Sequence, residues 1–412
     1  MSGCTSIVPQ ANLSDAIQAG GEPETTEPIT EAPTEPPVVD KLVRVIAVGD
    51  NLVQTGVYNE AERYKGEYDE YNFKPLYEGV KDIVKLGDIS IINQETLIAN
   101  GKFPVSGTNY HFNSPIELGR DMIDLGFNVF TVANNHLLDL RIEGLEASLD
   151  YWDSMVNLHG VKVVGAYRND EDMANIRTME INGVTVAFLA YTEHLNGYKL
   201  PSSSNVKVIW TSEKTVMESQ IRQAKSIADA VIVSVHWGAE DTHTVTQERK
   251  DLAKEMIDWG CDVIIGTHPH TAQTMEYIER GDGTRGFVYY SLGNFISAQT
   301  DNFNLIGEIA DFTIKVDGYT GAVSVVDVGA IPVITHYDNG RFANMRLIPY
   351  WDYTGELASS HGVPYAPYGT AKDFSMKVVD RIVNNNIPEE FRILTKPFAG
   401  TAGNLIAEDD FY

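Results

Sequence analysis

The stretch DVIIGTHPHT, from Asp262 to Thr271, shows the pattern that indicates the fold of this chain, a hydrophobic run that ends in polar residues. Its hydrophobic run, 263–265, ends at a glycine, and two histidines follow one residue apart, His268 and His270. A short apolar run that is bounded by turn residues is typical of a buried strand. Loop histidines are common without a function, so the pair alone leaves open a metal site or two ordinary histidines.

Several other hydrophobic runs end in polar residues in the same way. The first is KLVRVIAVGD (41–50), and helix-like stretches such as SPIELGRDMIDLG (114–126) and TQERKDLAKEMIDWG (246–260) separate the later ones. Strands that alternate with amphipathic helices indicate an α/β fold with helices covering the sheets. In such sheets, polar residues at the carboxyl ends of strands gather along one edge, where ligands usually bind. The strand ends carry Asp50, Glu95, Asn135, His136, His236, His268, His270 and Asn294.

After about residue 305 the chain alternates as strands do, in IGEIADFTIKV (306–316) and AVSVVDVGAIPVIT (322–335), and we expect these strands to complete the sheet system. We therefore predict a folded α/β domain over 43–335. An N-terminal segment, 1–42, precedes this domain, and a C-terminal extension, 336–412, follows it without an indicated role.

The formal net charge of −27 argues against nucleic acid as a partner, because phosphate neutralisation needs clustered lysine and arginine. A polyanionic substrate would need a local basic patch or metal ions rather than the overall field. The sequence has no run of 18 or more apolar residues, so it predicts no membrane-spanning segment.

The N-terminal segment combines a cysteine with an acidic linker. The start, MSGCTS, resembles the part of a bacterial lipobox that remains after cleavage before Cys4, although a chance tripeptide is the alternative. The stretch GGEPETTEPITEAPTEPPVVD (20–40) is rich in Pro, Thr and Glu, and we expect it to be extended and disordered. This layout predicts an extracytoplasmic protein that is held on a bacterial membrane by a lipid on Cys4.

The residue types at the strand ends suit metal binding. His, Asp, Glu and Asn are ligands for divalent Mn, Fe and Zn, and HPH places two imidazoles where each can face a different ion. The set is too scattered for a zinc finger. It fits a two-metal hydrolytic site, where the ions activate water and neutralise the charge of the group under attack.

Six motifs in register carry a resemblance to a known family. They are VIAVGDNLV (45–53), GDISIINQET (87–96), NVFTVANNHLLDL (128–140), VSVHWGAE (233–240), DVIIGTHPH (262–270) and VYYSLGNF (288–295). Together they closely resemble the capsule-synthesis CapA (poly-γ-glutamate capsule) family, which is similar to the calcineurin-like metallophosphatases. The resemblance implies a metallophosphatase-like fold of layered β-sheets flanked by helices.

The resemblance also implies a role for each matched residue. The implied metal ligands are Asp50, Glu95, Asn135, His236, His268 and His270. Glu95 would bridge both ions, His268 would join His236 at one of them, and His270 would face the other. His136 would meet the substrate or donate a proton, with Asp139 fixing its tautomer. Asn93, Glu240 and Asn294 would line the substrate pocket.

Two positions depart from the family pattern. Leu52 stands where metallophosphatases usually have a histidine ligand, so one of the two metal sites is expected to be weak. Arg141 stands where the family usually has glycine, and it is either a clamp for a carboxylate or phosphate of the substrate or a solvated charge. Outside the matched positions, His194 in AYTEHLNG (190–197) is the one further histidine that we expect near the site.

Three functions remain open from the sequence. The first is a metal-dependent hydrolase that acts on a phosphoester or amide at the cell surface, with a small phosphoester or an anionic surface polymer as substrate. The second is a non-catalytic accessory protein that binds, anchors or releases a polymer such as poly-γ-glutamate. The third is a scaffold that has lost its metal, for which Leu52 is the only hint.

Overall fold

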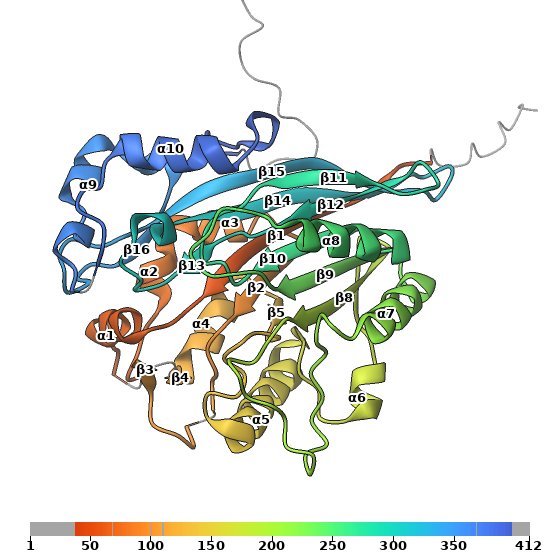
Figure 1. Cartoon of the computed structure of the whole chain (residues 1–412), viewed down its shortest axis with the longest axis horizontal. Helices are drawn as coiled ribbons and strands as arrows, with labels where there is room; N and C mark the ends of the chain where they lie inside the picture. Colours follow the sequence, from red (N-terminus) through yellow and green to blue (C-terminus); the bar gives the residue numbers. More distant parts are fainter. Residues whose placement is uncertain (1–37, 68, 100, 109–110, 368, 398–412) are drawn as a thin grey trace, which may run out of the picture. The chain divides into compact units, whose positions relative to one another are not determined.

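The computed structural model describes residues 38–67, 69–99, 101–108, 111–367 and 369–397 (Figure 1). Cys4 and the linker up to residue 37 lie outside the described residues, so the lipid anchor stays a prediction. Within the described ranges, no helix combines the length and the apolar character that crossing a membrane requires.

The larger sheet joins parallel and antiparallel strands. Its order is β16 (Arg346–Pro349), β15 (Val323–His336), β14 (Ile306–Val316), β1 (Lys41–Asn51), β2 (Ile89–Gln94), β5 (Val129–Thr131) and β6 (Lys162–Val164), and β13 (Asn294–Ile296) pairs with the end of β1. In this sheet β1, β2, β5 and β6 run parallel to one another. In contrast, β14 is antiparallel to β1, β15 to β14, and β16 to β15.

The second sheet has a parallel centre. Its order is β11 (Met275–Glu279), β12 (Arg285–Tyr289), β10 (Val263–Thr267), β9 (Ala230–His236), β8 (Val184–Thr192) and β7 (Arg177–Ile181). Only the edge strands β11 and β7 are antiparallel to their neighbours. A separate hairpin consists of β3 (Ser106–Thr108) and β4 (His111–Asn113).

Helices flank both sheets (Figure 1). They are α1 (Thr55–Arg63), α2 (Lys74–Tyr77), α3 (Lys81–Val84), α4 (Glu117–Leu125), α5 (Arg141–His159), α6 (Asp170–Ala174), α7 (Lys214–Ile227), α8 (Gln247–Trp259), α9 (Gly355–Ser360) and α10 (Met376–Asn386). Short 3-10 helices lie at Glu78–Val80, Asn302–Leu305, Tyr350–Asp352, Val363–Tyr365 and Glu389–Phe391. Helices α7 and α8 cover the second sheet, and α4 and α5 pack together, with α5 against β6.

The two sheets face each other across a hydrophobic core. Strand β1 contacts β8 and β10, β12 contacts β15, and the rings of Tyr289 and Phe312 lie 6.1 Å apart between them. A second apolar cluster joins the other face of the second sheet to α7 and α8. The predicted α/β fold of layered sheets flanked by helices is confirmed.

The last strands complete the larger sheet, as expected from their alternation. β14 pairs with β1 over eight residue positions, and β15 pairs with β14. β15 ends at His336, and β16 then adds an edge strand from the segment predicted as the C-terminal extension. Residues 346–349 therefore belong to the same sheet system as β1.

Candidate metal centre

The ends of parallel strands from both sheets bring the predicted ligands together. In the larger sheet, Asp50 lies at the end of β1 and Glu95 directly follows β2. In the second sheet, His236 is the last residue of β9 and His268 directly follows β10. All four side chains are buried. The edge where ligands were predicted to gather is therefore shared by the two sheets.

Two groups of side chains converge closely enough to hold a metal ion. Glu95, His268 and His270 form one group and Asp50, Glu95 and His236 form the other, with one ligand atom of each residue within 4.8 Å of the others. Glu95 belongs to both groups. This central position is the one that a carboxylate bridging two ions requires.

Glu95 is buried, and neither of its carboxylate oxygens has a hydrogen-bond partner among the described residues. The closest imidazole nitrogens to its Oε1 are His236 Nε2 at 3.5 Å, His270 Nε2 at 3.8 Å and His136 Nε2 at 3.9 Å. Burial raises the pKa of Glu95 well above its usual range, and the charge of Asp50 raises it further. A buried carboxylate with no partner is costly, and a bound cation would remove this cost.

His270 is held by its Nδ1 atom. This atom lies 3.1 Å from Asp50 Oδ2 and 3.0 Å from Asn294 Oδ1, so Nδ1 carries the proton and Nε2 faces Glu95. Burial alone lowers the pKa of His270, but the charge of Glu95 and the hydrogen bond to Asp50 raise it to about 10. A metal ion beside Glu95 would stabilise its charged form, which burial alone disfavours.

His236 and His268 are the candidate ligands whose imidazoles are held neutral. Burial lowers both pKa values far below the usual range, with neighbouring histidines adding to the effect. His236 Nδ1 lies 3.0 Å from Thr267 Oγ1, and its Nε2 lies 3.0 Å from Asn135 Oδ1. His268 Nδ1 is buried without a partner. Unpartnered carboxylate oxygens beside neutral imidazoles form a donor set that fits a divalent Mn, Fe or Zn ion.

The HPH turn adopts an unusual backbone conformation. His268 and His270 have φ values of 97° and 57°, in the left-handed region that side chains disfavour. Such conformations cost about 1–3 kcal/mol each and occur mainly where function requires them. The turn is fixed by the backbone N–H of His268, which donates to Asp50 Oδ2 at 3.1 Å, and by that of Asp241, which donates to the carbonyl of Pro269 at 2.9 Å.

His136 lies beside the cluster with one nitrogen free. Its Nδ1 donates to Asp139 Oδ2 at 2.9 Å, which leaves Nε2 facing Glu95. The backbone N–H of Phe112 also donates to Asp139 Oδ2, and the Phe112 ring packs 4.6 Å from the imidazole. Asp139 therefore fixes the tautomer of His136.

The four residues predicted to bind substrate fall into two pairs. Asn93 and Asn294 are buried, and they support ligands: Asn93 Nδ2 donates to Asp50 Oδ1 at 2.7 Å, and Asn294 Oδ1 accepts from His270. Glu240 and Arg141 are exposed. Arg141 begins α5, and its guanidinium lies 4.0 Å above the Tyr198 ring. Leu52 is buried, so its apolar side chain belongs to the core beside Asp50.

The loop after β8 contributes contacts that the motifs did not predict in full. His194 Nε2 lies 3.1 Å from His268 Nε2, which places this histidine beside the cluster. Asn196 Oδ1 accepts a hydrogen bond from Asn135 Nδ2 at 3.2 Å, and no sequence signal had indicated Asn196. The sequence signal for His194 is its position directly after a hydrophobic run. The candidate ligands have the same kind of position.

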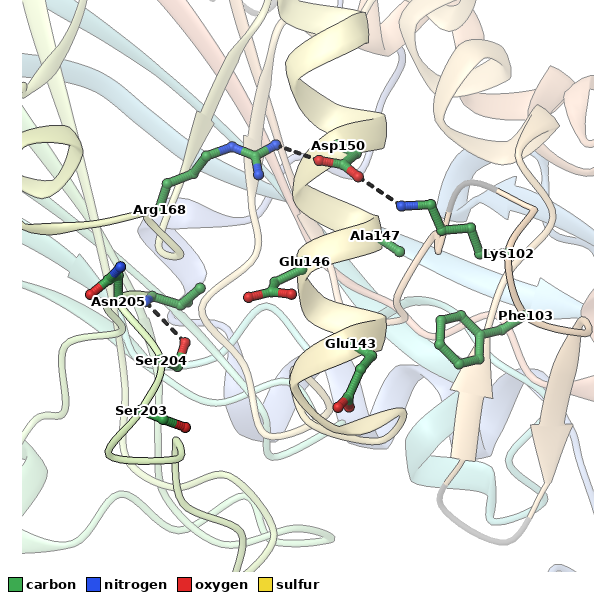
Figure 2. Close-up of a pocket in the computed structure, with 11 residues that line it drawn as sticks. Lys102, Phe103, Glu143, Glu146, Ala147, Asp150, Arg168, Ser203, Ser204 and Asn205 are labelled. Carbon is green, nitrogen blue, oxygen red and sulfur yellow. Dashed lines mark hydrogen bonds and ion pairs between the residues drawn. The ribbon is translucent and has the colours of Figure 1, made fainter.

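A separate cavity of about 570 Å³ lies along α5 (Figure 2). Asp150 binds Lys102 at 2.8 Å and Arg168 at 2.9 Å there, while Glu143 and Glu146 project from the same helix. The three carboxylates outnumber the two cations. This cavity is therefore not suited to a polyanion.

Comparisons with known proteins agree with the motifs. The family model described as bacterial capsule synthesis protein PGA_cap matches residues 44–299. The PGA biosynthesis protein CapA of Bacillus subtilis (strain 168) is 28% identical over 255 residues, 61% of this chain and 64% of that protein. The capsule biosynthesis protein CapA of Bacillus anthracis is 30% identical over 267 residues, 61% of this chain and 59% of that protein. The chain thus spans about three fifths of the length of these relatives.

Two solved structures are also among the matches. A phosphatase from Mycoplasma pneumoniae matches with a TM-score of 0.41 and 15% identity, over 72% of this chain and 95% of that one. A putative 5'-nucleotidase from Staphylococcus aureus matches with a TM-score of 0.42 and 13% identity, over 75% of this chain and 54% of that one.

Proposed function

The chain belongs to the bacterial capsule synthesis protein family PGA_cap, and from this premise we propose that it is a metal-dependent hydrolase. Its substrate would be a phosphoester or amide, in an anionic surface polymer or in a small phosphoester. One observation carries the proposal: Glu95 is buried among imidazoles with both carboxylate oxygens unpartnered. A carboxylate in this position is explained by a cation that it binds.

The proposed centre holds two divalent ions, of Mn, Fe or Zn. Asp50, Glu95, Asn135, His236, His268 and His270 would hold them, and Glu95 would contact both. The site nearer Asp50 would be the weaker one, because Leu52 replaces a histidine there. When bound, such ions activate water and neutralise the charge that develops on the group under attack.

His136 would supply the proton for the leaving group. Asp139 accepts the Nδ1 proton of His136 and so orients Nε2 toward the side that faces Glu95, where it would donate to the leaving group. Arg141 would hold a carboxylate or phosphate of the substrate, because it is exposed near the loop that borders the cluster.

The alternative is a non-catalytic accessory protein that uses the metal centre to bind, anchor or release an anionic polymer. The names of the two Bacillus relatives favour it, since they state capsule and PGA biosynthesis rather than hydrolysis. A hydrolase loses activity on His136→Ala while it stays folded. A polymer binder keeps its polymer affinity in the same variant.

Elemental analysis of protein purified without chelator is the first test, beside a His268→Ala/His270→Ala double variant. We expect about one to two metal ions per parent chain and none in the variant. That result would justify a substrate screen. A parent that is metal-free and does not take up Mn or Zn would contradict both the hydrolase and a polymer binder that uses the metal centre, and would leave a polymer binder without a metal or a scaffold.

We also propose that the protein is extracytoplasmic and anchored by a lipid on Cys4. Support comes from the lipobox-like start and the acidic Pro/Thr linker that follows it. Mass spectrometry of the N-terminal peptide from membranes of the producing cell tests this. An unmodified Cys4 would contradict the anchor.

A further inference from the structure

The short loop after β8, Glu193–Tyr198, borders the ligand cluster at three points. His194 Nε2 lies 3.1 Å from His268 Nε2, and Asn196 Oδ1 accepts from Asn135 Nδ2 at 3.2 Å. The carboxylate of Glu193 accepts from the backbone N–H of Gly238, two residues after His236, at 2.8 Å. The family resemblance gives none of these loop residues a role.

The contact with His194 determines which nitrogen of His268 can bind a metal. A neutral imidazole has one N–H and one lone pair. Within the described part of the chain the buried His268 Nδ1 has no hydrogen-bond partner, whereas its Nε2 faces His194. The proton therefore belongs on Nε2, which donates it to His194 Nε2. This tautomer leaves the lone pair of Nδ1 free for a metal ion.

The contact with Asn196 determines which end of the Asn135 amide can face a metal ion. The amide of Asn135 has an oxygen that can bind a metal and an NH2 group that cannot. Its Nδ2 donates to Asn196, and its Oδ1 lies 3.0 Å from His236 Nε2 inside the cluster. Asn196 therefore turns the oxygen, rather than the nitrogen, toward the ligands.

The loop is itself held in place. The Oγ1 of Thr192 donates to the carbonyl of His194 at 3.1 Å, and the backbone N–H of Tyr198 donates to the carbonyl of Leu195 at 2.8 Å. Glu193 also forms an ion pair with Arg249. Asn196 has a φ of 49°, a conformation that asparagine tolerates better than most residues. The two acceptor atoms, on His194 and Asn196, are thus fixed before any metal ion binds.

From these contacts we propose that His194 and Asn196 are positioning residues of the metal centre, which fix the tautomer of His268 and the amide orientation of Asn135. This inference rests on the proposed function, because it needs a metal at the cluster. Partners that orient metal ligands typically change metal affinity about 10- to 100-fold. With Leu52 in the place of a ligand, the remaining ligands depend more strongly on such support.

Two deletions with matched replacements test the proposal. His194→Ala removes one acceptor, and His194→Gln returns an amide oxygen at a similar reach. Asn196→Gly removes the other acceptor without backbone strain, and Asn196→Asp keeps an acceptor oxygen. Asn182→Gly is the control, because Asn182 is an exposed asparagine with a similar φ of 54° at the β7–β8 turn. Circular dichroism verifies that each variant folds.

The readouts are Mn2+ and Zn2+ affinity by chelator competition and the visible absorption spectrum of bound Co2+. We expect about 10- to 100-fold weaker binding and a changed Co2+ spectrum in His194→Ala and Asn196→Gly. Binding should recover to within a few-fold of the parent in His194→Gln and Asn196→Asp. The control should bind like the parent.

Three outcomes contradict the proposal in distinguishable ways. Parent-like affinity in both deletions would show that the loop does not position the ligands. Equal losses in the deletions and in the replacements would show a merely structural role for the loop. A parent that binds no metal would overturn the metal centre itself. If His194→Ala does not fold, His194→Gln and the Asn196 pair decide the question.

Discussion

At the scale of single residues, the site depends on one close backbone approach beside Asp50. A Cβ atom on Gly49 would lie 1.9 Å from the carbonyl oxygen of Gly293, the same oxygen that accepts the backbone N–H of Asp50 at 2.9 Å. Only glycine therefore lets β1 reach the strand end where Asp50 meets the histidines. The position of this candidate ligand therefore depends on the glycine that precedes it.

Gly49→Ala should therefore destabilise the protein and weaken metal uptake together. We expect a loss of about 1–3 kcal/mol in the free energy of unfolding, because the added methyl group forces the backbone of Asp50 away from Gly293. Denaturant unfolding and elemental analysis measure the two effects. Gly281→Ala is the control, since a Cβ atom there meets nothing within 4 Å. Equal stability of the two variants would contradict this account.

The sequence predicted which residues meet at the site better than it predicted their roles. Residues that end hydrophobic runs, such as Asp50 and His236, were predictable because parallel strands end at a common edge. The contact between His194 and His268 joins residues 74 positions apart, and no local pattern specifies it. Asn93 and Asn294 matched family motifs, but only the structure shows their hydrogen bonds to the candidate ligands Asp50 and His270.

At the scale of secondary structure elements, buried histidines join the end of β15 to the segment after α9. His361 Nε2 donates to the carbonyl of Thr335 at 3.0 Å, and its Nδ1 accepts from the backbone N–H of Val363 at 3.0 Å. The neutral ring satisfies both bonds, and a protonated ring would lose the second. The ring of His336 lies 4.8 Å away, and its Nδ1 lies 2.9 Å from the Tyr353 hydroxyl.

This connection should weaken in acid. Burial lowers the pKa of His361 to about 3 and that of His336 to about 4, from the ordinary 6.5. Below pH 6.5 the unfolded chain binds protons that the folded chain does not bind, so this part of the stability is complete above pH 6.5 and falls toward pH 4. Chemical unfolding of the parent and of His361→Gln between pH 7 and 4 measures it. The variant should lose less stability over this range, and parallel curves would contradict the prediction.

Element boundaries were predictable only where the hydrophobic pattern was long. The alternation over β14 and β15 indicated that they complete the sheet system, and they do. β16 is only four residues long and ends in Pro349, which is too short for a periodic signal. The division of the parallel strands between two sheets was not predictable, because buried strands of both sheets have the same near-continuous apolar runs.

At the scale of the whole molecule, the net charge of −27 opposes the approach of an anionic substrate. Under the proposed function the attraction must come from a few local groups, namely the proposed metal ions and the exposed Arg141, against the net repulsion of the whole molecule. Bound divalent ions cancel only a small part of this charge. Local binding and long-range repulsion respond differently to salt, because screening acts most strongly on well-separated, exposed charges.

A proposed anionic polymer substrate should therefore bind more tightly as salt rises from about 0.01 M to about 0.15 M, where the Debye length falls from about 30 Å to about 8 Å. The shortened range removes repulsion by the distant carboxylates and leaves the contacts at the buried metal centre largely intact. Equilibrium binding of a polyglutamate at a fixed metal concentration measures this, and a neutral peptide is the control. Affinity that falls steadily over the same range would contradict it, because it would mean that exposed cations rather than the buried centre hold the polymer.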